Sequence, residues 1–200
     1  MTAKLLGIVG SYRKNGVTDR LVTEVLSSAQ AFGALTKKIY LVDARIEFCR
    51  NCRQCTQQPG ELPGKCVQAD DMDAILREWR ECDGLVIGAP VNFYNVTALT
   101  RRFMERLVCF AYWPWGQAMP KLRSNRNRKR AVLITASAMP SLMGRVFTGA
   151  ERALRLTAKT MGAKPVRLIF AGMVAQEEHH ALSDKLLAKA RSAGRQLAIQ

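Results

Sequence analysis

Short apolar runs recur along this 200-residue chain, and segments with helical periodicity separate them. The runs are nearly continuous rather than alternating, which is typical of strands that are buried on both faces. Strict alternation of such strands with helices requires a parallel sheet that is covered on both sides. The predicted strands are residues 4–10, 37–42, 83–90, 130–136 and 166–172. The predicted helices lie near residues 17–31, 70–81, 96–112, 146–161 and 178–198.

This rhythm predicts an α/β fold, a doubly wound five-stranded parallel sheet of flavodoxin size with helices on both faces. The length suits one core, so residues 1–200 are expected to form a single domain. No apolar run reaches the length of a membrane span or of the central region of a signal peptide. We therefore expect a cytoplasmic protein with no membrane partner and reduced cysteines.

The segment GSYRKNGVTDRL, residues 10–21, follows the first predicted strand and leads into a helix. Its glycines, hydroxyls and backbone N–H groups favour an anion at the helix N-terminus, and Arg13 adds a charge-assisted contact. Tyr12 stands where a dinucleotide motif needs its second glycine, and no Gly-Lys-Ser/Thr follows. The loop thus predicts a site for a terminal phosphomonoester. The alternative is that Ser11 and Thr18 only cap turns.

In this position the loop resembles the FMN phosphate loop of the NADPH-dependent FMN reductases, a flavodoxin-like family. Residues 88–107, GAPVNFYNVTALTRRFMERL, are similar to the family's strand, loop and helix around the flavin ring, with Glu105 and Arg106 as its acid–arginine pair. Residues 135–144, TASAMPSLMG, resemble the third flavin-flanking loop. The residues that the resemblance assigns to FMN are Ser11, Arg13, Asn15, Val17, Thr18, Pro90, Val91, Asn92, Phe93, Tyr94, Asn95, Ala136 and Ser137.

The physical sense of the second motif is that Pro90 ends a strand and frees the backbone groups of residues 91–95 for the polar edge of a flavin. Phe93 or Tyr94 would pack beside the ring, and the alternative is that these aromatic side chains fill core space. In the third motif, Ala136 and Ser137 are small enough for a planar ring to lie against the backbone.

Four of the six cysteines lie in residues 48–66, FCRNCRQCTQQPGELPGKC. Three thiols at two-residue intervals and one further Cys resemble cubane ligation more than the paired knuckles of zinc sites. Within the resembled family, the iron-sulfur flavoproteins carry such a run, which implies a possible 4Fe-4S cluster on Cys49, Cys52, Cys55 and Cys66. The ten-residue gap before Cys66 is longer than that subgroup's usual spacing, so zinc and unligated thiols stay open. Cys82 and Cys109 are expected to be buried hydrophobes.

The resemblance implies an FMN-dependent NAD(P)H oxidoreductase that passes electrons to the cluster, to a small acceptor such as a quinone, or to a protein. Hydride transfer from NAD(P)H to FMN needs no side-chain acid or base, so no catalytic residue is predicted. Family members are commonly homodimers or homotetramers. Because the cysteine loop follows the second strand, it is expected to reach the flavin of a neighbouring subunit.

The net charge of +15 favours anionic partners without choosing among them. The densest basic run, residues 121–130, lacks the aromatic platforms of single-strand binders, so we interpret it as a solvated loop and expect no nucleic-acid partner. Two rival functions remain. One is an electron-carrier flavoprotein without NAD(P)H activity, for which the charge would select an acidic redox partner. The other is a thiol or zinc sensor that has lost the flavin.

Overall fold

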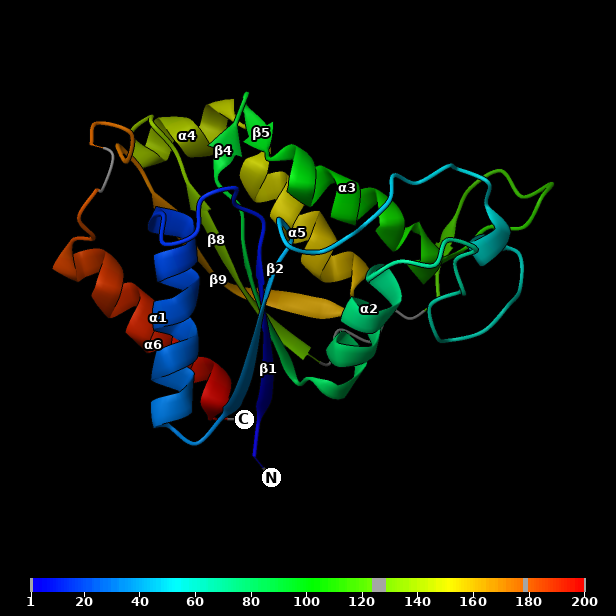
Figure 1. Ribbon diagram of the computed structural model, residues 1–200, viewed down its shortest axis with the longest axis horizontal. Coiled ribbons are helices and arrows are strands. Elements are labelled where there is room, and N and C mark those ends of the chain that lie inside the picture. The colour runs from blue at the N-terminus through cyan, green and yellow to red at the C-terminus, as the bar shows by residue number, and fades with distance from the viewer. Residues whose placement is uncertain (1, 124–128, 178–179, 200) are drawn as a thin grey trace.

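A computed structural model of the chain describes residues 2–123, 129–177 and 180–199. Its centre is a five-stranded parallel sheet with the strand order β2-β1-β3-β8-β9 (Figure 1). The predicted doubly wound α/β fold is therefore confirmed. The strands are β1 (Lys4–Val9), β2 (Leu35–Tyr40), β3 (Gly84–Gly88), β8 (Lys129–Ala136) and β9 (Ala163–Ala171).

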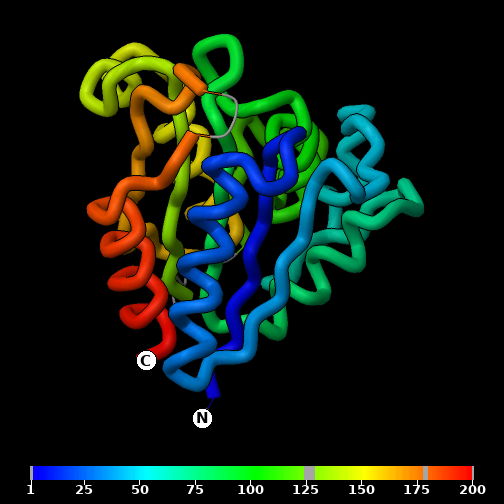
Figure 2. Tube along the Cα trace, turned by 60° about the vertical axis from the view of Figure 1, so that its left-hand side comes forward, coloured from blue at the N-terminus to red at the C-terminus, as the bar shows by residue number. Residues whose placement is uncertain are grey.

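Helices cover both faces of the sheet (Figure 2). On one face α1 (Val17–Ala31) and α6 (Asp184–Ala198) pack side by side. On the other lie α2 (Met72–Glu81), α3 (Ala98–Arg106) and α5 (Ala150–Thr160). The shorter α4 (Ser141–Phe147) occupies the third predicted flavin-flanking loop, where the sequence predicted irregular structure. Each predicted helix exists, and the last four begin two to six residues later than expected.

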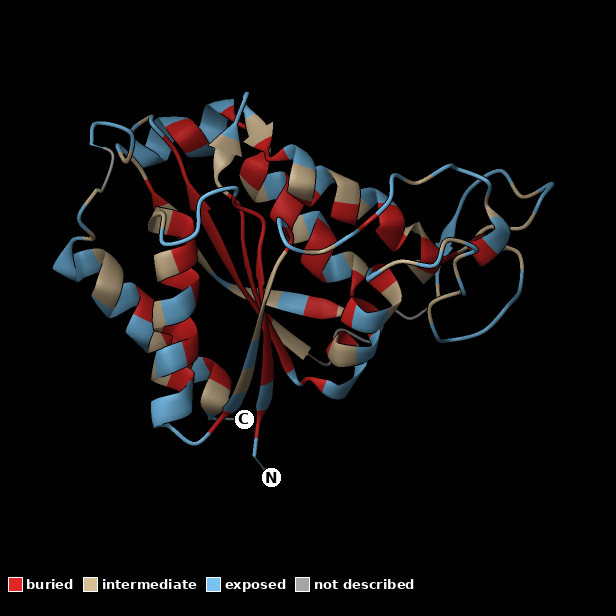
Figure 3. Ribbon diagram, in the orientation of Figure 1, coloured by how far each residue is buried: buried red, intermediate tan, exposed pale blue. Residues whose placement is uncertain are grey.

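The prediction that all five strands are buried on both faces is wrong for the two edges. Strands β1, β3 and β8 are buried almost throughout, whereas β2 has only exposed and half-buried positions and β9 mixes buried, half-buried and exposed ones (Figure 3). An edge strand has a neighbour on one side only, so its flank and part of its faces meet solvent. Leu35, at the start of β2, is exposed for this reason.

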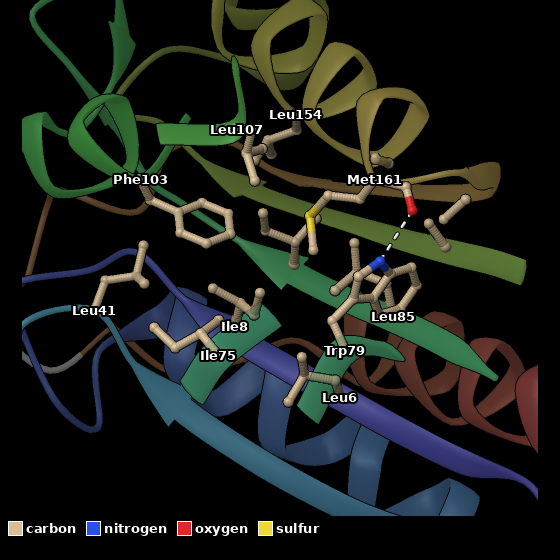
Figure 4. Close-up of a cluster of buried hydrophobic side chains, with 14 of the residues drawn as sticks. Leu6, Ile8, Leu41, Ile75, Trp79, Leu85, Phe103, Leu107, Leu154 and Met161 are labelled. Carbon is tan, nitrogen blue, oxygen red and sulfur yellow. Dashed lines mark hydrogen bonds between the residues drawn. The ribbon is translucent and has the colours of Figure 1, made fainter. Parts of the chain in front are cut away.

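Two apolar cores stabilise the sheet, one on each face. The larger one lies between the sheet and helices α2, α3 and α5, with Phe103 and Leu107 facing Leu6, Ile8 and other strand residues (Figure 4). Trp79 of α2 is buried here, and its indole N–H donates to the carbonyl of Met161 at 2.9 Å. Burying such a large side chain requires this partner for its polar group.

The sheet order decides which loops meet. Strands β1, β3 and β8 are neighbours, so the loops at their carboxyl ends emerge side by side. The chain changes direction across the sheet between β1 and β3, and ligands of open α/β sheets bind at such a switch point. The Gly10 N–H donates to the carbonyl of Gly88 at 2.7 Å, which ties the first two loops together.

Further short elements lie between the main strands and helices. The predicted helix 96–112 ends at Arg106, and a 3-10 turn and a short strand take up its remaining residues. A hairpin of β4 (Val91–Asn92) and β5 (Asn95–Val96) follows β3, and a second hairpin joins β6 (Ala111–Tyr112) to β7 (Lys121–Leu122). Single 3-10 turns occur at η1 (Gln54–Thr56) and η2 (Leu107–Phe110). Two-residue strands carry too little pattern to be predicted from periodicity.

The ends of the basic run 121–130 have structural contacts. The Lys129 ammonium donates to the carbonyls of Trp79 at 2.8 Å and Arg80 at 3.0 Å, at the C-terminus of α2. A cation there complements the helix dipole. Residues 124–128, the middle of the run, lie outside the described residues, so the interpretation as a solvated loop stays a prediction.

Candidate functional site

The loop after β1 wraps the N-terminus of α1. Ser11 is buried, and its hydroxyl bonds both the N–H and the carbonyl of Arg13, each at 3.1 Å. Asn15 has a φ of 62°, and Gly16 is the N-cap of α1. Glycine offers no side-chain cap, so the first-turn N–H groups remain for a ligand. Ser11 thus closes a turn, as the alternative prediction held, while the helix end keeps the form of an anion site.

The residues of this loop that were predicted to bind the phosphate differ in burial. Thr18 is buried and Val17 half-buried at the start of α1, whereas the side chain of Arg13 is exposed. An exposed guanidinium can reach over a phosphate from the rim of the loop. The five predicted residues of the first motif therefore surround one helix N-terminus, as a phosphomonoester site requires.

Asp19 is a buried carboxylate beneath the loop that sequence reasoning missed. It accepts hydrogen bonds from the Asn15 N–H at 2.7 Å, the Lys38 ammonium at 3.0 Å and the Tyr40 hydroxyl at 3.2 Å. Burial opposes the charge of Lys38, but its hydrogen bonds with Tyr40 and Asp19 raise its pKa. The lysine therefore offsets the carboxylate, and the network holds Asn15 in its left-handed conformation. The only sequence signal for Asp19 was the presence of an acidic residue in the first turn of a predicted helix.

Two threonines of α3 support the same loop from the other side. The Thr97 hydroxyl donates to the carbonyl of Gly10 at 2.6 Å, and the Thr100 hydroxyl lies 2.9 Å from that of Thr97. A Cβ at Gly10 would overlap Thr100 Oγ1. The backbone of the phosphate loop can approach α3 only because residue 10 is glycine.

The second predicted loop forms the β4–β5 hairpin, with Phe93 and Tyr94 at its tip. Both have positive φ values, 47° and 62°, and their side chains are 94% and 60% exposed. The rings meet edge to face with centroids 6.4 Å apart. The alternative that these residues fill core space is therefore wrong. The β4–β5 hairpin lies at the same end of the sheet as the loop before α1 (Figure 1).

The remaining residues of the second motif lie lower on the hairpin. Pro90 and Val91 are half-buried, and Asn92 is exposed. Asn95 instead turns inward, since its amide packs against Gly149 before α5 and its Oδ1 accepts the N–H of Val96 at 2.9 Å. Residues 90–94 thus lie at the surface, where the prediction puts the flavin. The Asn95 side chain instead forms contacts within the hairpin and with Gly149.

The third loop begins at the buried residues Ala136 and Ser137. The Ser137 N–H donates to the carbonyl of Ala171 at 2.8 Å, and its hydroxyl accepts the N–H of Met139 at 3.0 Å. The loop is therefore fixed against β9 before α4 starts. Because β8 lies beside β3, this loop emerges next to the loop of the second motif.

The four clustered cysteines lie around one cavity on the other side of α3. Cys49, Cys52, Cys55 and Cys66 all line it, together with Arg106 and Val108. Within the described parts of the chain, no group of three or more His, Cys, Asp and Glu side chains is arranged to hold a single metal ion. Cys82 and Cys109 are buried, as predicted. The long insert between the third and fourth thiols folds back, so their separation in sequence does not separate them in space.

The other three thiols affect the ionisation of Cys55. Burial and the neighbouring Cys66, Cys49 and Cys52 raise the pKa of Cys55 to about 11. Thiolates are soft donors that a shared cationic centre stabilises, and four cysteines line this cavity. The donor set therefore fits an iron-sulfur cluster in kind and number.

Arg106, which the resemblance assigned to an acid–arginine pair with Glu105, lines this cavity and pairs with Asp70 instead. Its guanidinium forms a buried, two-pronged ion pair with Asp70 and donates to Cys66 Sγ at 3.4 Å. Burial opposes ionisation of both partners, yet their pairing raises the pKa of Arg106 and lowers that of Asp70. The helix that supports the phosphate loop with Thr97 therefore supports the cysteine loop with its last residue.

Two further arginines hold the cysteine loop against the β6–β7 hairpin. The Arg53 guanidinium lies between Trp113 and Trp115, at 3.8 and 4.2 Å from the ring centroids. Arg123 donates to the carbonyls of Cys55 at 2.9 Å and Cys109 at 3.1 Å. The aromatic stretch of residues 110–116 thus packs on the cysteine loop, which its spacing did not predict.

Comparison with known proteins agrees with this geometry. The sequence model of the NADPH-dependent FMN reductases matches residues 3–176. The chain belongs to the NADPH-dependent FMN reductase family. Within the described residues, no helix combines the length and the apolar character that a membrane crossing needs.

Relatives of this FMN reductase family member include archaeal iron-sulfur flavoproteins. One from Archaeoglobus fulgidus is 32% identical over 111 residues, which are 56% of this chain and 48% of the relative. One from Methanocaldococcus jannaschii is 38% identical over 103 residues, 52% of this chain and 51% of the relative. The chain thus spans about half the length of the curated relatives it matches.

Solved structures share the fold. An FMN-dependent NADH-azoreductase of Bacillus anthracis, in complex with FMN, superimposes with a TM-score of 0.71 at 12% identity. The match covers 99% of this chain and 100% of that one. At 12% identity this likeness concerns the fold alone, which is a flavodoxin-like sheet.

Proposed function

We propose that the protein is an FMN-dependent NAD(P)H oxidoreductase that passes electrons from a nicotinamide through FMN to a 4Fe-4S cluster or to a small acceptor such as a quinone. The observation that carries the proposal is that one helix, α3, contacts both a phosphate loop at the switch point of the sheet and a cavity lined by four thiols. A flavin site and a cysteine site on one rigid element are suited to electron transfer.

In this proposal the loop of residues 10–18 holds the FMN phosphate. The N–H groups of the first turn of α1 and the Arg13 side chain bind its oxygens, while Asp19 and Lys38 keep the loop in shape. Bound FMN would supply the hydride-accepting and electron-releasing chemistry. The backbone of residues 90–94 orients the polar edge of the ring, and Phe93 and Tyr94 shield it from water.

The four cysteines are the proposed cluster ligands. Cys49, Cys52 and Cys55 come from one turn of the loop, and Cys66 is fixed by Arg106. A cluster held there would accept and give single electrons. The related proteins of Archaeoglobus fulgidus and Methanocaldococcus jannaschii are iron-sulfur flavoproteins, and the position of the four thiols around one cavity supports a cluster here as well.

The two sites lie at opposite ends of α3, a helix of nine residues. At 1.5 Å per residue this helix is about 13 Å long, which separates the two sites within one chain. Assembly as a homodimer or homotetramer, with the cysteine loop of one copy near the flavin of another, is part of the proposal. The physiological acceptor is left to measurement.

A visible absorption spectrum of protein purified without oxygen, with iron and acid-labile sulfide assayed on the same sample, tests the proposal. We expect flavin bands above a broad iron-sulfur shoulder, with about four irons per chain. Oxidation of NADH or NADPH under the same conditions distinguishes the enzyme from an electron carrier. Colourless protein that cannot be reconstituted with FMN would overturn the flavin assignment.

Matched cysteine variants separate the two cofactors. Cys52→Ala removes an exposed thiol that lines the cavity, and Cys82→Ala removes a buried thiol at the end of α2. We expect the first variant to lose iron and keep FMN, and the second to keep both. Equal iron content in the two variants would contradict the assignment of the cluster to this cavity.

A further inference from the structure

The Arg106 side chain is unusual because a full positive charge is buried beside a sulfur atom. Its two terminal nitrogens reach four acceptors, namely the Glu47 carbonyl, both carboxylate oxygens of Asp70 and Cys66 Sγ. The side chain is 2% exposed and that of Asp70 is 1% exposed. Buried ion pairs of this kind contribute little net stability compared with apolar residues of similar volume, so stability alone is a weak reason for the pair.

The geometry holds the guanidinium in one orientation. Asp70 is itself fixed, since its carboxylate also accepts the N–H groups of Glu47 at 2.8 Å and Met72 at 3.1 Å. A two-pronged contact with a fixed carboxylate leaves the arginine little freedom. One terminal N–H is thereby directed at Cys66, which is 40 residues away in sequence.

A charged donor suits a thiolate and not a thiol. The sulfur of a neutral Cys is a weak acceptor, whereas a metal-bound thiolate carries negative charge that a charge-assisted hydrogen bond stabilises. Reduction of a cluster adds one more negative charge, which is partly delocalised onto the thiolates. Hydrogen bonds to the sulfur ligands therefore favour the reduced form.

We propose that Arg106 is a positioning residue that sets the reduction potential of the cluster through its hydrogen bond to Cys66, while Asp70 holds it in place and offsets its charge. The inference rests on the proposed 4Fe-4S site. It assigns to α3 a second task beyond support of the phosphate loop: the last residue of the helix makes the cluster a better electron acceptor.

Four proteins form the test: wild type, Asp70→Asn, Arg106→Gln and the double variant. The midpoint potential of the cluster is measured in each by anaerobic redox titration followed by electron paramagnetic resonance, with the FMN potential of the same sample as an internal reference. Arg106→Gln leaves an unpaired carboxylate and Asp70→Asn an unpaired guanidinium. The double variant is neutral like the wild type but lacks the charge-assisted donor.

We expect the midpoint potential of the cluster in Arg106→Gln to be lower than in the wild type by at least about 59 mV. For one electron this is a tenfold change in the equilibrium constant of reduction. The Asp70→Asn potential is expected to rise. The double variant should lie below the wild type and above Arg106→Gln, with the FMN potential unchanged in all four. A loosened loop could not shift the two single variants in opposite directions.

Arg77→Gln is the control, because it also removes one positive charge, but from an exposed position of α2 that is not among the residues lining the cysteine cavity. Its cluster potential should equal that of the wild type. A double variant at the wild-type potential, or single variants that shift in the same direction, would overturn the inference and leave the proposed function standing.

Two other outcomes are also decisive. Wild-type protein without iron would overturn the cluster and this inference together. If Arg106→Gln does not retain a cluster, Asp70→Asn still tests the inference. A cluster potential in Asp70→Asn that is lower than that of the wild type, or equal to it, contradicts the role of Arg106.

Discussion

Phe93 and Tyr94 combine two unfavourable features, since bulky side chains adopt left-handed backbone conformations and remain exposed. Two-residue hairpin loops with both residues at positive φ normally carry Asn and Gly. Each such outlier costs about 1–3 kcal/mol and tends to occur at functional sites. The pair therefore supports the proposed ring contact, because packing in the free protein does not explain two aromatic residues there.

Replacement of the pair by the favoured turn residues tests this interpretation. We expect Phe93→Asn/Tyr94→Gly to raise the free energy of unfolding by about 1–3 kcal/mol, because backbone strain is relieved and little burial is lost. Affinity for FMN should fall, as measured by fluorescence titration. Phe93→Leu keeps the strain and serves as the control. Unchanged stability in the double variant would contradict the assignment of strain.

Gly10 shows how a single residue sets the distance between two elements. We expect Gly10→Ala to lower the free energy of unfolding by about 1–3 kcal/mol, since its Cβ overlaps Thr100 Oγ1. Gly10→Ala/Thr100→Ala removes the overlapping atom and should recover most of the loss. Denaturant unfolding of both variants and of Thr100→Ala alone gives the interaction free energy between residues 10 and 100. Additive effects of the two substitutions would exclude a direct clash.

The cysteine loop is held mainly by arginines that come from, or bind to, other elements. Arg53 is enclosed by the two tryptophans, Arg106 comes from α3, and Arg123 follows β7. Gly64 lies so close to the Cys55 backbone that a Cβ there would overlap the carbonyl. These contacts, more than a core of its own, give the loop one conformation.

Loss of Arg123 should therefore open the loop. Arg123→Met leaves the carbonyls of Cys55, Gln58 and Cys109 without this donor. We expect roughly tenfold faster proteolysis within residues 56–65, because about 1.4 kcal/mol of local stability corresponds to a factor of ten. Arg77→Met, at an exposed position of α2, should be cleaved like the wild type. Equal cleavage of both variants would show that other contacts hold the loop.

At the scale of the whole molecule, the end of the sheet that carries the predicted flavin loops exposes several large apolar side chains. Helix α4 has seven residues, and Leu142, Met143, Val146 and Phe147 among them are exposed. The β4–β5 hairpin, whose Phe93 and Tyr94 are exposed, lies at the same end (Figure 1). A patch of this kind is typical of association surfaces, and it supports the predicted self-association of the chain.

A charge in this patch should weaken association. We expect Val146→Glu, at a side chain that is 68% exposed, to shift a dimer or tetramer toward monomer in light-scattering measurements. The control is Leu35→Glu, which is 59% exposed at the opposite end of the sheet. Both variants should keep the thermal stability of the wild type, since neither side chain is buried. Identical masses for the two variants would place the interface elsewhere.

Much of this arrangement follows from local pattern. The interior strands, the helices between them and the phosphate loop were predictable because burial imposes a period on the chain and a strand-loop-helix order is local. The exposed face of β2, the hairpin at Phe93 and the position of Arg106 were not, because each depends on neighbours that are distant in sequence.

The sequence by itself determined the alternation of strands and helices, the loop between the first strand and α1, and the presence of four thiols within one loop. Only the tertiary structure decided that β1, β3 and β8 are neighbours, that Asp19 lies beneath the phosphate loop, and that Arg106 reaches Cys66. The physical reason is that periodicity records whether a residue is buried, but not what it is buried against. In a parallel sheet those partners come from segments tens of residues apart.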